Sequence, residues 1–271
     1  MESLDFDDLD RYLLAQNGRI IHQVWFSTGI LHRRESAKAY AKLKNCRDSW
    51  KIKNPTWCHI EWNRQHSMQF MKDFYPEHFD MYRKYKYEIQ RCDVVRYFFL
   101  HRYGGLYADM DYYCNKPFDE ALQKYSGDLY LVKTPNGITD HVSNSLMYSK
   151  PGHVYWKKLF MKLEQNKVKY ASYYQKHIIV MYTTGPGIVS SVFNEFRIRH
   201  SLQWFPSNEF HPFGISDDIK TLANKPDVYA IHLGKGSWEK GDSKFLIFLF
   251  RDWKIVIFII AVMLIATMIS I

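Results

Sequence analysis

Short apolar runs alternate with longer stretches of helical periodicity along most of this chain. Short continuous apolar runs are typical of buried strands, whereas apolar positions three or four apart indicate helices with one buried face. The pattern predicts strands at residues 20–26, 56–62, 106–110, 129–132, 145–148, near 203 and at 228–233. It predicts helices at residues 34–49, 65–74, 77–102, 153–164 and 187–198. Strands alternating with helices indicate an α/β fold built on a mainly parallel sheet.

The last residues form a separate apolar segment. Residues 255–271 carry no charged side chain, and only Thr267 and Ser270 among them are polar. At about 1.5 Å rise per residue, a helix over this segment spans roughly 25 Å, near the lower limit for crossing a bilayer. A terminal helix that is apolar on every face has no face for water, so we expect a C-terminal membrane anchor.

This segment divides the chain into two expected parts, a folded domain at 1–244 and an interfacial and anchoring segment at 245–271. Arg251 and Lys254 lie just before the apolar run. Because cations concentrate on the cytoplasmic side of membrane helices, we expect a single-pass protein whose domain faces the cytosol, with a Golgi or ER lumen left open. The first ten residues are acidic and show no apolar signal region.

Charge and cysteine content narrow the possible partners. The formal net charge is +9, which attracts phosphates, anionic lipids and nucleic acids alike. No recognisable nucleic-acid-binding module contains the basic residues, so we expect no nucleic-acid partner. The four cysteines include no C-x-x-C pair, which indicates reduced thiols and not a zinc site. Aromatic residues make up 17% of the chain, a surplus that suits stacking on bases and sugars.

One stretch of the chain concentrates polar residues in an ordered pattern. Asp93 and Arg96 are three apart in a predicted helix, so they share a face and can act together. Gly104 and Gly105 end that helix and permit close approach of the backbone.

A short apolar strand then delivers Asp109 and Asp111 at alternate positions. Paired carboxylates at a strand end suit Mg²⁺ or Mn²⁺, which complete their coordination with diphosphate oxygens. A lone D-x-D arises often by chance. Its combination with D-x-x-R-Y and a Gly-Gly turn at this spacing makes it specific.

These blocks resemble a known family. The sequence I-H-Q-V-W at 21–25, the D-x-x-R-Y…G-G-x-Y-x-D-x-D block, and further blocks at 116–119, 134–138, 184–186 and 232–238 occur in the family's order. The chain is similar to the DxD glycosyltransferases related to the yeast initiation-type α-mannosyltransferases and to the inositol phosphoceramide mannosyltransferases (glycosyltransferase family thirty-two). The resemblance covers most of residues 20–244.

The resemblance implies a GT-A fold and retaining transfer from a nucleotide sugar with Mn²⁺ or Mg²⁺. It implies catalytic roles for Asp93, Arg96, Asp109 and Asp111. The residues expected to contact the donor are Trp25, Tyr97, Gly104, Gly105, Asn144, Ser237 and Trp238.

His232 ends a predicted strand beside a Gly-Lys-Gly loop. Its imidazole is a candidate third metal ligand after Asp109 and Asp111. A strand-end histidine bonded to the backbone is the alternative.

Several functions stay open at this point. The expected reaction moves mannose from GDP-mannose to a membrane lipid of the inositol phosphoceramide type, in sphingolipid metabolism. One alternative uses UDP-glucose, UDP-galactose or UDP-N-acetylglucosamine and acts on a glycan or a protein. Another is a catalytically idle membrane adaptor that keeps the fold. No residue is identified as a covalent nucleophile, which favours same-face substitution at the anomeric carbon.

Overall fold

A computed structural model describes residues 6–26, 33–135, 141–173, 175–200, 202–212 and 219–234. The predicted anchor at 255–271, the wider segment at 245–271, and Ser237 and Trp238 lie outside these residues. Among the described helices, none is both long enough and apolar enough to cross a bilayer. The anchor and the orientation of the domain therefore stay predictions.

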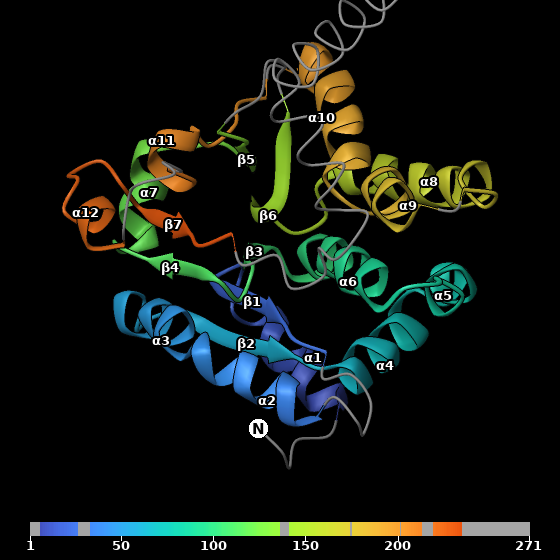
Figure 1. The fold of residues 1–271 in the computed structure, drawn as a ribbon, viewed down its shortest axis with the longest axis horizontal. Helices are drawn as coiled ribbons and strands as arrows, with labels where there is room; N and C mark the ends of the chain where they lie inside the picture. Colours follow the sequence, from blue (N-terminus) through green and yellow to red (C-terminus); the bar gives the residue numbers. More distant parts are fainter. Residues whose placement is uncertain are drawn as a thin grey trace, which may run out of the picture.

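A central five-stranded sheet has the order β2-β1-β3-β6-β5 (Figure 1). Strands β1, β2 and β3 are parallel, and β6 runs antiparallel to both of its neighbours. The α/β class is confirmed, but the sheet is mixed and not mainly parallel, because β5 and β6 form an antiparallel pair. The strands are β1 (Ile20–Val24), β2 (Cys58–Trp62), β3 (Gly105–Ala108), β4 (Tyr112–Cys114), β5 (Leu129–Lys133), β6 (Val142–Ser149) and β7 (Ala230–His232).

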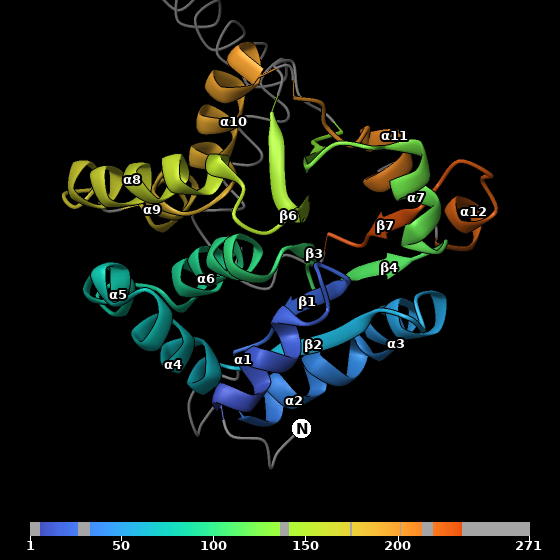
Figure 2. The same cartoon turned by 180° about the vertical axis from the view of Figure 1, so that it is seen from behind.

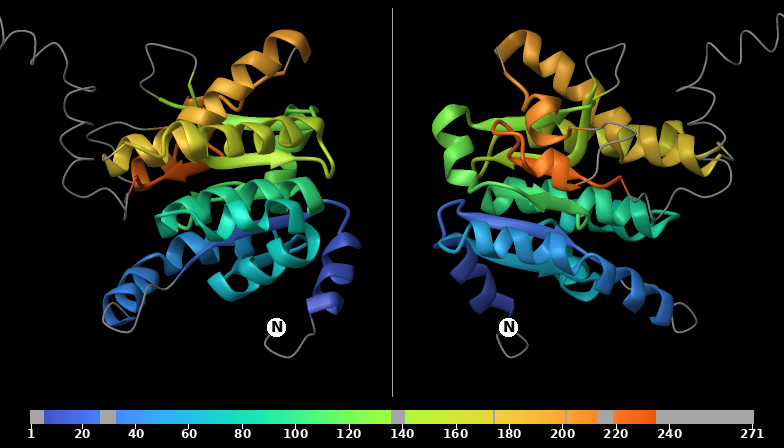
Figure 3. Two further views of the ribbon diagram at one scale, coloured as in Figure 1. Left: turned by 90° about the vertical axis from the view of Figure 1, so that its right-hand side faces the viewer. Right: turned by 60° about the vertical axis from the view of Figure 1, so that its left-hand side comes forward.

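Helices lie on both sides of the sheet, and Figure 2 shows the same arrangement from behind. Helix α10 extends beyond the sheet at one end (Figure 3). The helices are α1 (Phe6–Leu14), α2 (Arg33–Lys42), α3 (Lys44–Lys53), α4 (Arg64–Phe74), α5 (Pro76–Arg83), α6 (Glu88–Tyr103), α7 (Phe118–Lys124), α8 (Val154–Lys169), α9 (Lys176–Thr183), α10 (Pro186–His200), α11 (Ser207–Phe210) and α12 (Ile219–Ala223).

Alternation along the strands divides the core between the two faces of the sheet. Ile20 and Tyr107 belong to a cluster with residues of α4, α6, α8 and α10, whereas their neighbours Ile21 and Leu106 belong to a cluster with Trp50 of α3. The small β4-β7 sheet lies over the second face and completes that cluster. Both faces are therefore covered, which explains the continuous apolar runs in the strands.

Two predicted helices are each two helices in the structure. The helix expected at 34–49 breaks at Leu43, which is buried between α2 and α3. The helix expected at 77–102 breaks between α5 and α6, where Gln90 Oε1 accepts a hydrogen bond from the Tyr87 backbone N–H (3.0 Å) and Arg91 donates to the Tyr85 carbonyl. No glycine or proline marks either break, so the local pattern could not reveal them. The strand expected near 203 is only an isolated bridge at Phe205.

The first helix, α1, was not predicted from the sequence. Asp10 is buried and receives hydrogen bonds from Arg102 Nε (2.7 Å) and Tyr103 OH (2.6 Å), which join α1 to the end of α6. The four cysteines are free thiols, as expected, and Cys46 and Cys114 are buried.

Candidate active site

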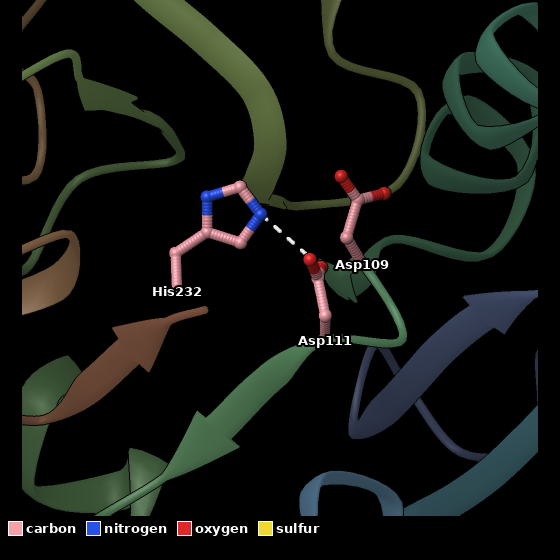
Figure 4. Close-up of side chains that lie close together, drawn as sticks. All are labelled: Asp109, Asp111 and His232. Carbon is pink, nitrogen blue, oxygen red and sulfur yellow. Dashed lines mark hydrogen bonds and ion pairs between the residues drawn. The ribbon is translucent and has the colours of Figure 1, made fainter. Parts of the chain in front are cut away.

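Asp109, Asp111 and His232 meet at the carboxyl end of β3. Asp109 directly follows that strand, Asp111 precedes β4, and His232 is the last residue of β7. One ligand atom from each residue lies within 4.8 Å of the other two. Figure 4 shows the two carboxylates and the imidazole in close proximity. The structure thus brings together the three predicted ligands, from segments far apart in the sequence.

Pairing of β4 with β7 explains how His232 reaches the aspartates. Tyr112 is opposite His232 in the antiparallel register, and the Leu233 N–H donates to the Asp111 carbonyl (3.1 Å). His232 Nε2 is 3.1 Å from Asp111 Oδ1. His232 therefore contacts side chains at both ring nitrogens, Asp111 at Nε2 and His211 at Nδ1.

The first aspartate is held from helix α6 and from its own strand. Arg96 Nη1 donates to Asp109 Oδ1 (2.8 Å), and Tyr107 OH donates to the same oxygen (2.7 Å). Tyr107 is two residues before Asp109, so strand alternation places both side chains on one face. Sequence reasoning missed Tyr107, although its spacing from Asp109 was the available signal.

A buried polar cluster surrounds Asp93 directly beneath this site. Asp93 is 5% exposed, and Arg96, its predicted partner on α6, is 4% exposed. Asp93 Oδ1 lies 3.2 Å from Arg96 Nη2 and accepts from Asn144 Nδ2 (3.1 Å), while Oδ2 accepts from Thr184 Oγ1 (3.1 Å). Burial raises the pKa of Asp93 to about 7, against an opposing effect of the Arg96 guanidinium.

Tyr97 supports this cluster. It is fully buried, its OH donates to the Thr184 carbonyl (2.6 Å), and it accepts from Asn144 Nδ2 (2.8 Å). Tyr97 therefore fixes the side chain of Asn144 on β6. Thr184, which belongs to the block at 184–186 that resembles the family, is a direct partner of Asp93.

The two glycines lie at the other end of β3. Gly104 has φ +67° and Gly105 has φ +95°, and a Cβ on Gly105 would lie 2.3 Å from the Ile20 carbonyl oxygen. The absence of a Cβ at Gly105 lets β3 approach β1 closely, and a Cβ on Gly104 would collide with Pro151. The donor contact expected of them stays a prediction.

Trp25 lies just past β1 at the same edge of the sheet as Asp109. Its backbone N–H donates to the Trp62 carbonyl (2.9 Å), and the centroid of its ring lies 5.7 Å from that of Tyr40. The donor contact expected of Trp25 stays a prediction.

Residues 41–128 match the family described as the glycosyltransferase sugar-binding region containing the DXD motif. The chain is 31% identical over 194 residues to mannosyl phosphorylinositol ceramide synthase CSH1 of Saccharomyces cerevisiae, covering 71% of this chain and 47% of that protein. It is 29% identical to inositol phosphoceramide mannosyltransferase 3 of Schizosaccharomyces pombe, covering 89% of this chain and 61% of that one. The chain thus spans about half to three fifths of the length of these relatives.

Among solved structures, mouse xyloside xylosyltransferase 1 is similar over 80% of this chain and 98% of that one, with 10% identity and a TM-score of 0.45. So distant a likeness carries no conclusion about function.

Proposed function

We propose a catalytic function from one premise: this chain belongs to the glycosyltransferase family whose sugar-binding region contains the DXD motif. The proposed reaction is a metal-dependent, retaining transfer of a hexose from a nucleotide sugar to a membrane lipid. GDP-mannose is the proposed donor and a lipid of the inositol phosphoceramide type the proposed acceptor, on the strength of the relatives' names. The GT-A fold belongs to the same proposal.

The observation that carries this proposal is the group of Asp109, Asp111 and His232 at the carboxyl end of β3. Two carboxylates and an imidazole form a donor set that suits Mn²⁺. Mg²⁺ prefers oxygen ligands, which the two carboxylates supply. The three ligand atoms are close enough to share one ion. When bound, such a cation supplies positive charge that stabilises a departing diphosphate.

Hydrogen bonds within the protein hold the side chains of this site in place without a ligand. Arg96 and Tyr107 both bond to Oδ1 of Asp109, so Oδ2 is the oxygen available for a ligand. Arg96 also donates to the Asn144 carbonyl (3.1 Å), which holds β6 against α6. Fixed donors and acceptors of this kind need no reorganisation during the reaction, which is how preorganised sites lower a barrier.

Retention without a covalent intermediate is part of the proposal. Asp93 is enclosed by Arg96, Asn144 and Thr184 and is 5% exposed, so its carboxylate is badly placed to attack an anomeric carbon. We therefore favour same-face substitution, in which the leaving diphosphate helps to remove the proton of the acceptor hydroxyl. Detection of a glycosyl-enzyme adduct by mass spectrometry would contradict this step.

A donor panel tests the function. Hydrolysis of GDP-mannose, UDP-glucose, UDP-galactose and UDP-N-acetylglucosamine is measured with Mn²⁺, with Mg²⁺ and with EDTA. We expect metal-dependent consumption of GDP-mannose, and loss of that activity in Asp111→Ala. Preference for a UDP-sugar would select the alternative donor. Absence of hydrolysis and of transfer to inositol phosphoceramide in vesicles would favour the idle adaptor.

A further inference from the structure

His211 occupies a fixed position beside the candidate metal site. It directly follows α11, and its N–H donates to the Ser207 carbonyl (2.8 Å). The Tyr229 N–H donates to the Glu209 carbonyl (2.8 Å), which joins α11 to the segment that leads into β7. The backbone thus sets the distance between His211 and the end of β7.

The two imidazoles at this point are in direct contact. His211 Nε2 lies 2.9 Å from His232 Nδ1, and the ring planes meet at 70° with centroids 4.6 Å apart. The ring of Tyr112 stacks on His232 at 4.5 Å with an interplanar angle of 10°. His232 is therefore constrained on one face and at one nitrogen, and its remaining nitrogen, Nε2, faces Asp111.

The contact between the two imidazoles affects which nitrogen of His232 carries its proton. A neutral imidazole has one N–H and one lone pair, so Nε2 can bind a metal only when Nδ1 carries the proton. That proton then needs an acceptor, and Nε2 of His211 is the atom at hydrogen-bond distance from it. We propose that His211 is a positioning residue that fixes the orientation and the metal-binding tautomer of His232, an inference that rests on the metal site of the proposed function.

The contact also links the tautomers of the two rings. Without a metal, the tautomer of His232 that carries its proton on Nε2 can donate to Asp111 Oδ1, and its Nδ1 can then accept a hydrogen bond from Nε2–H of His211. With a metal, each ring keeps one proton but carries it on Nδ1, and the hydrogen bond between the rings reverses. Among the described residues, Nδ1 of His211 has no hydrogen-bond partner. The metal-free arrangement leaves only a lone pair on this atom, whereas the metal-bound arrangement places an unpaired N–H there.

Mn²⁺ titration of the metal-free protein, followed by electron paramagnetic resonance of the free ion, tests this inference without any assay of turnover. We expect His211→Leu to weaken Mn²⁺ binding by about tenfold or more, as loss of an outer partner of a histidine ligand typically does. His211→Gln, whose amide oxygen can take the place of Nε2 as acceptor, should stay within about threefold of wild type. His59→Leu is the matched control, because His59 is a partly buried β2 histidine whose ring nitrogens have no hydrogen-bond partner within the described part of the chain.

The outcomes distinguish failure of the His211 role from failure of the metal site itself. Wild-type Mn²⁺ affinity in His211→Leu, combined with lost affinity in His232→Ala, would overturn the role of His211 and leave the metal site standing. Wild-type affinity in both His232→Ala and Asp111→Ala would overturn the metal site and this inference with it. Should His211→Leu fail to fold, ¹⁵N spectra of the wild-type protein saturated with Mg²⁺ decide the matter. They should show His232 protonated on Nδ1, and protonation on Nε2 would overturn the inference.

Discussion

The guanidinium of Arg96 lies 2.8 Å from the carboxylate of Asp109, so helix α6 holds the first aspartate of the DXD motif. The same guanidinium lies 3.2 Å from Asp93, one turn earlier on α6. Its planar fork thus joins a buried carboxylate to one that faces the candidate metal site. The Arg96 side chain therefore affects both the stability of this region and the orientation of the Asp109 carboxylate.

Replacing Arg96 by Met should reduce the free energy of unfolding by about 3 kcal/mol or more, because Asp93 is left as a buried carboxylate without its charged partner. Urea unfolding at pH 8, where Asp93 of the wild-type protein is largely ionised, measures this loss. Arg64→Met is the matched control: Arg64 is half exposed in its pair with Glu88, so its loss should stay below about 1 kcal/mol. Equal losses in the two variants would contradict the assigned role of Arg96.

Asp93 should make a contribution to stability that falls with rising pH. Burial raises its pKa to about 7, so the folded protein binds this proton more tightly than the unfolded chain, whose carboxyl has a pKa near 3.8. This contribution to stability is complete below about pH 4 and is lost as the pH rises through about 7. In metal-free protein, urea unfolding at pH 5 and pH 8 measures the change in stability, which should be more favourable to the folded state at pH 8 for Asp93→Asn than for wild type. The same change in both proteins would show that Asp93 does not contribute in this way.

Asp111→Asn should lower metal-dependent donor hydrolysis by about 100-fold or more, since a neutral amide is a weak ligand and the charge on the leaving group loses its counterion. Treatment with EDTA should bring the wild type to the same residual rate and leave the variant nearly unchanged. Thermal unfolding should be unaffected in metal-free protein. Asp128→Asn, in an exposed ion pair with Lys150, is the control and should keep full activity.

Gly105→Ala should destabilise the protein much more than Gly152→Ala. Both glycines have positive φ, at +95° and +70°, so alanine is strained at either position. At Gly152 a Cβ would meet nothing within 4 Å, and about 1 kcal/mol of backbone strain is expected. At Gly105 the Cβ would also collide with the Ile20 carbonyl. Denaturant unfolding of both variants measures the difference, and similar losses would mean that the close approach of β3 and β1 is not essential.

Much of the site follows from local spacing. Asp93 and Arg96 share a helix face because they are three apart, and Asp109 follows a strand because an apolar run precedes it. The β-strands were predicted well where apolar runs were continuous, as in β1 and β5. The breaks at Leu43 and between α5 and α6 were not predictable in this way, since they depend on burial and on side-chain hydrogen bonds to the backbone.

The sequence by itself determined the α/β class, the helix face that carries Asp93 and Arg96, and the strand end that presents Asp109. Only the tertiary structure decided what surrounds these residues. His232 contacts Asp111 across 121 positions of sequence, and His211 reaches His232 because α11 is bonded to the segment before β7. Such contacts arise from the pairing of β4 with β7 and the packing around it. The periodicity of a local segment does not indicate which distant strand it pairs with.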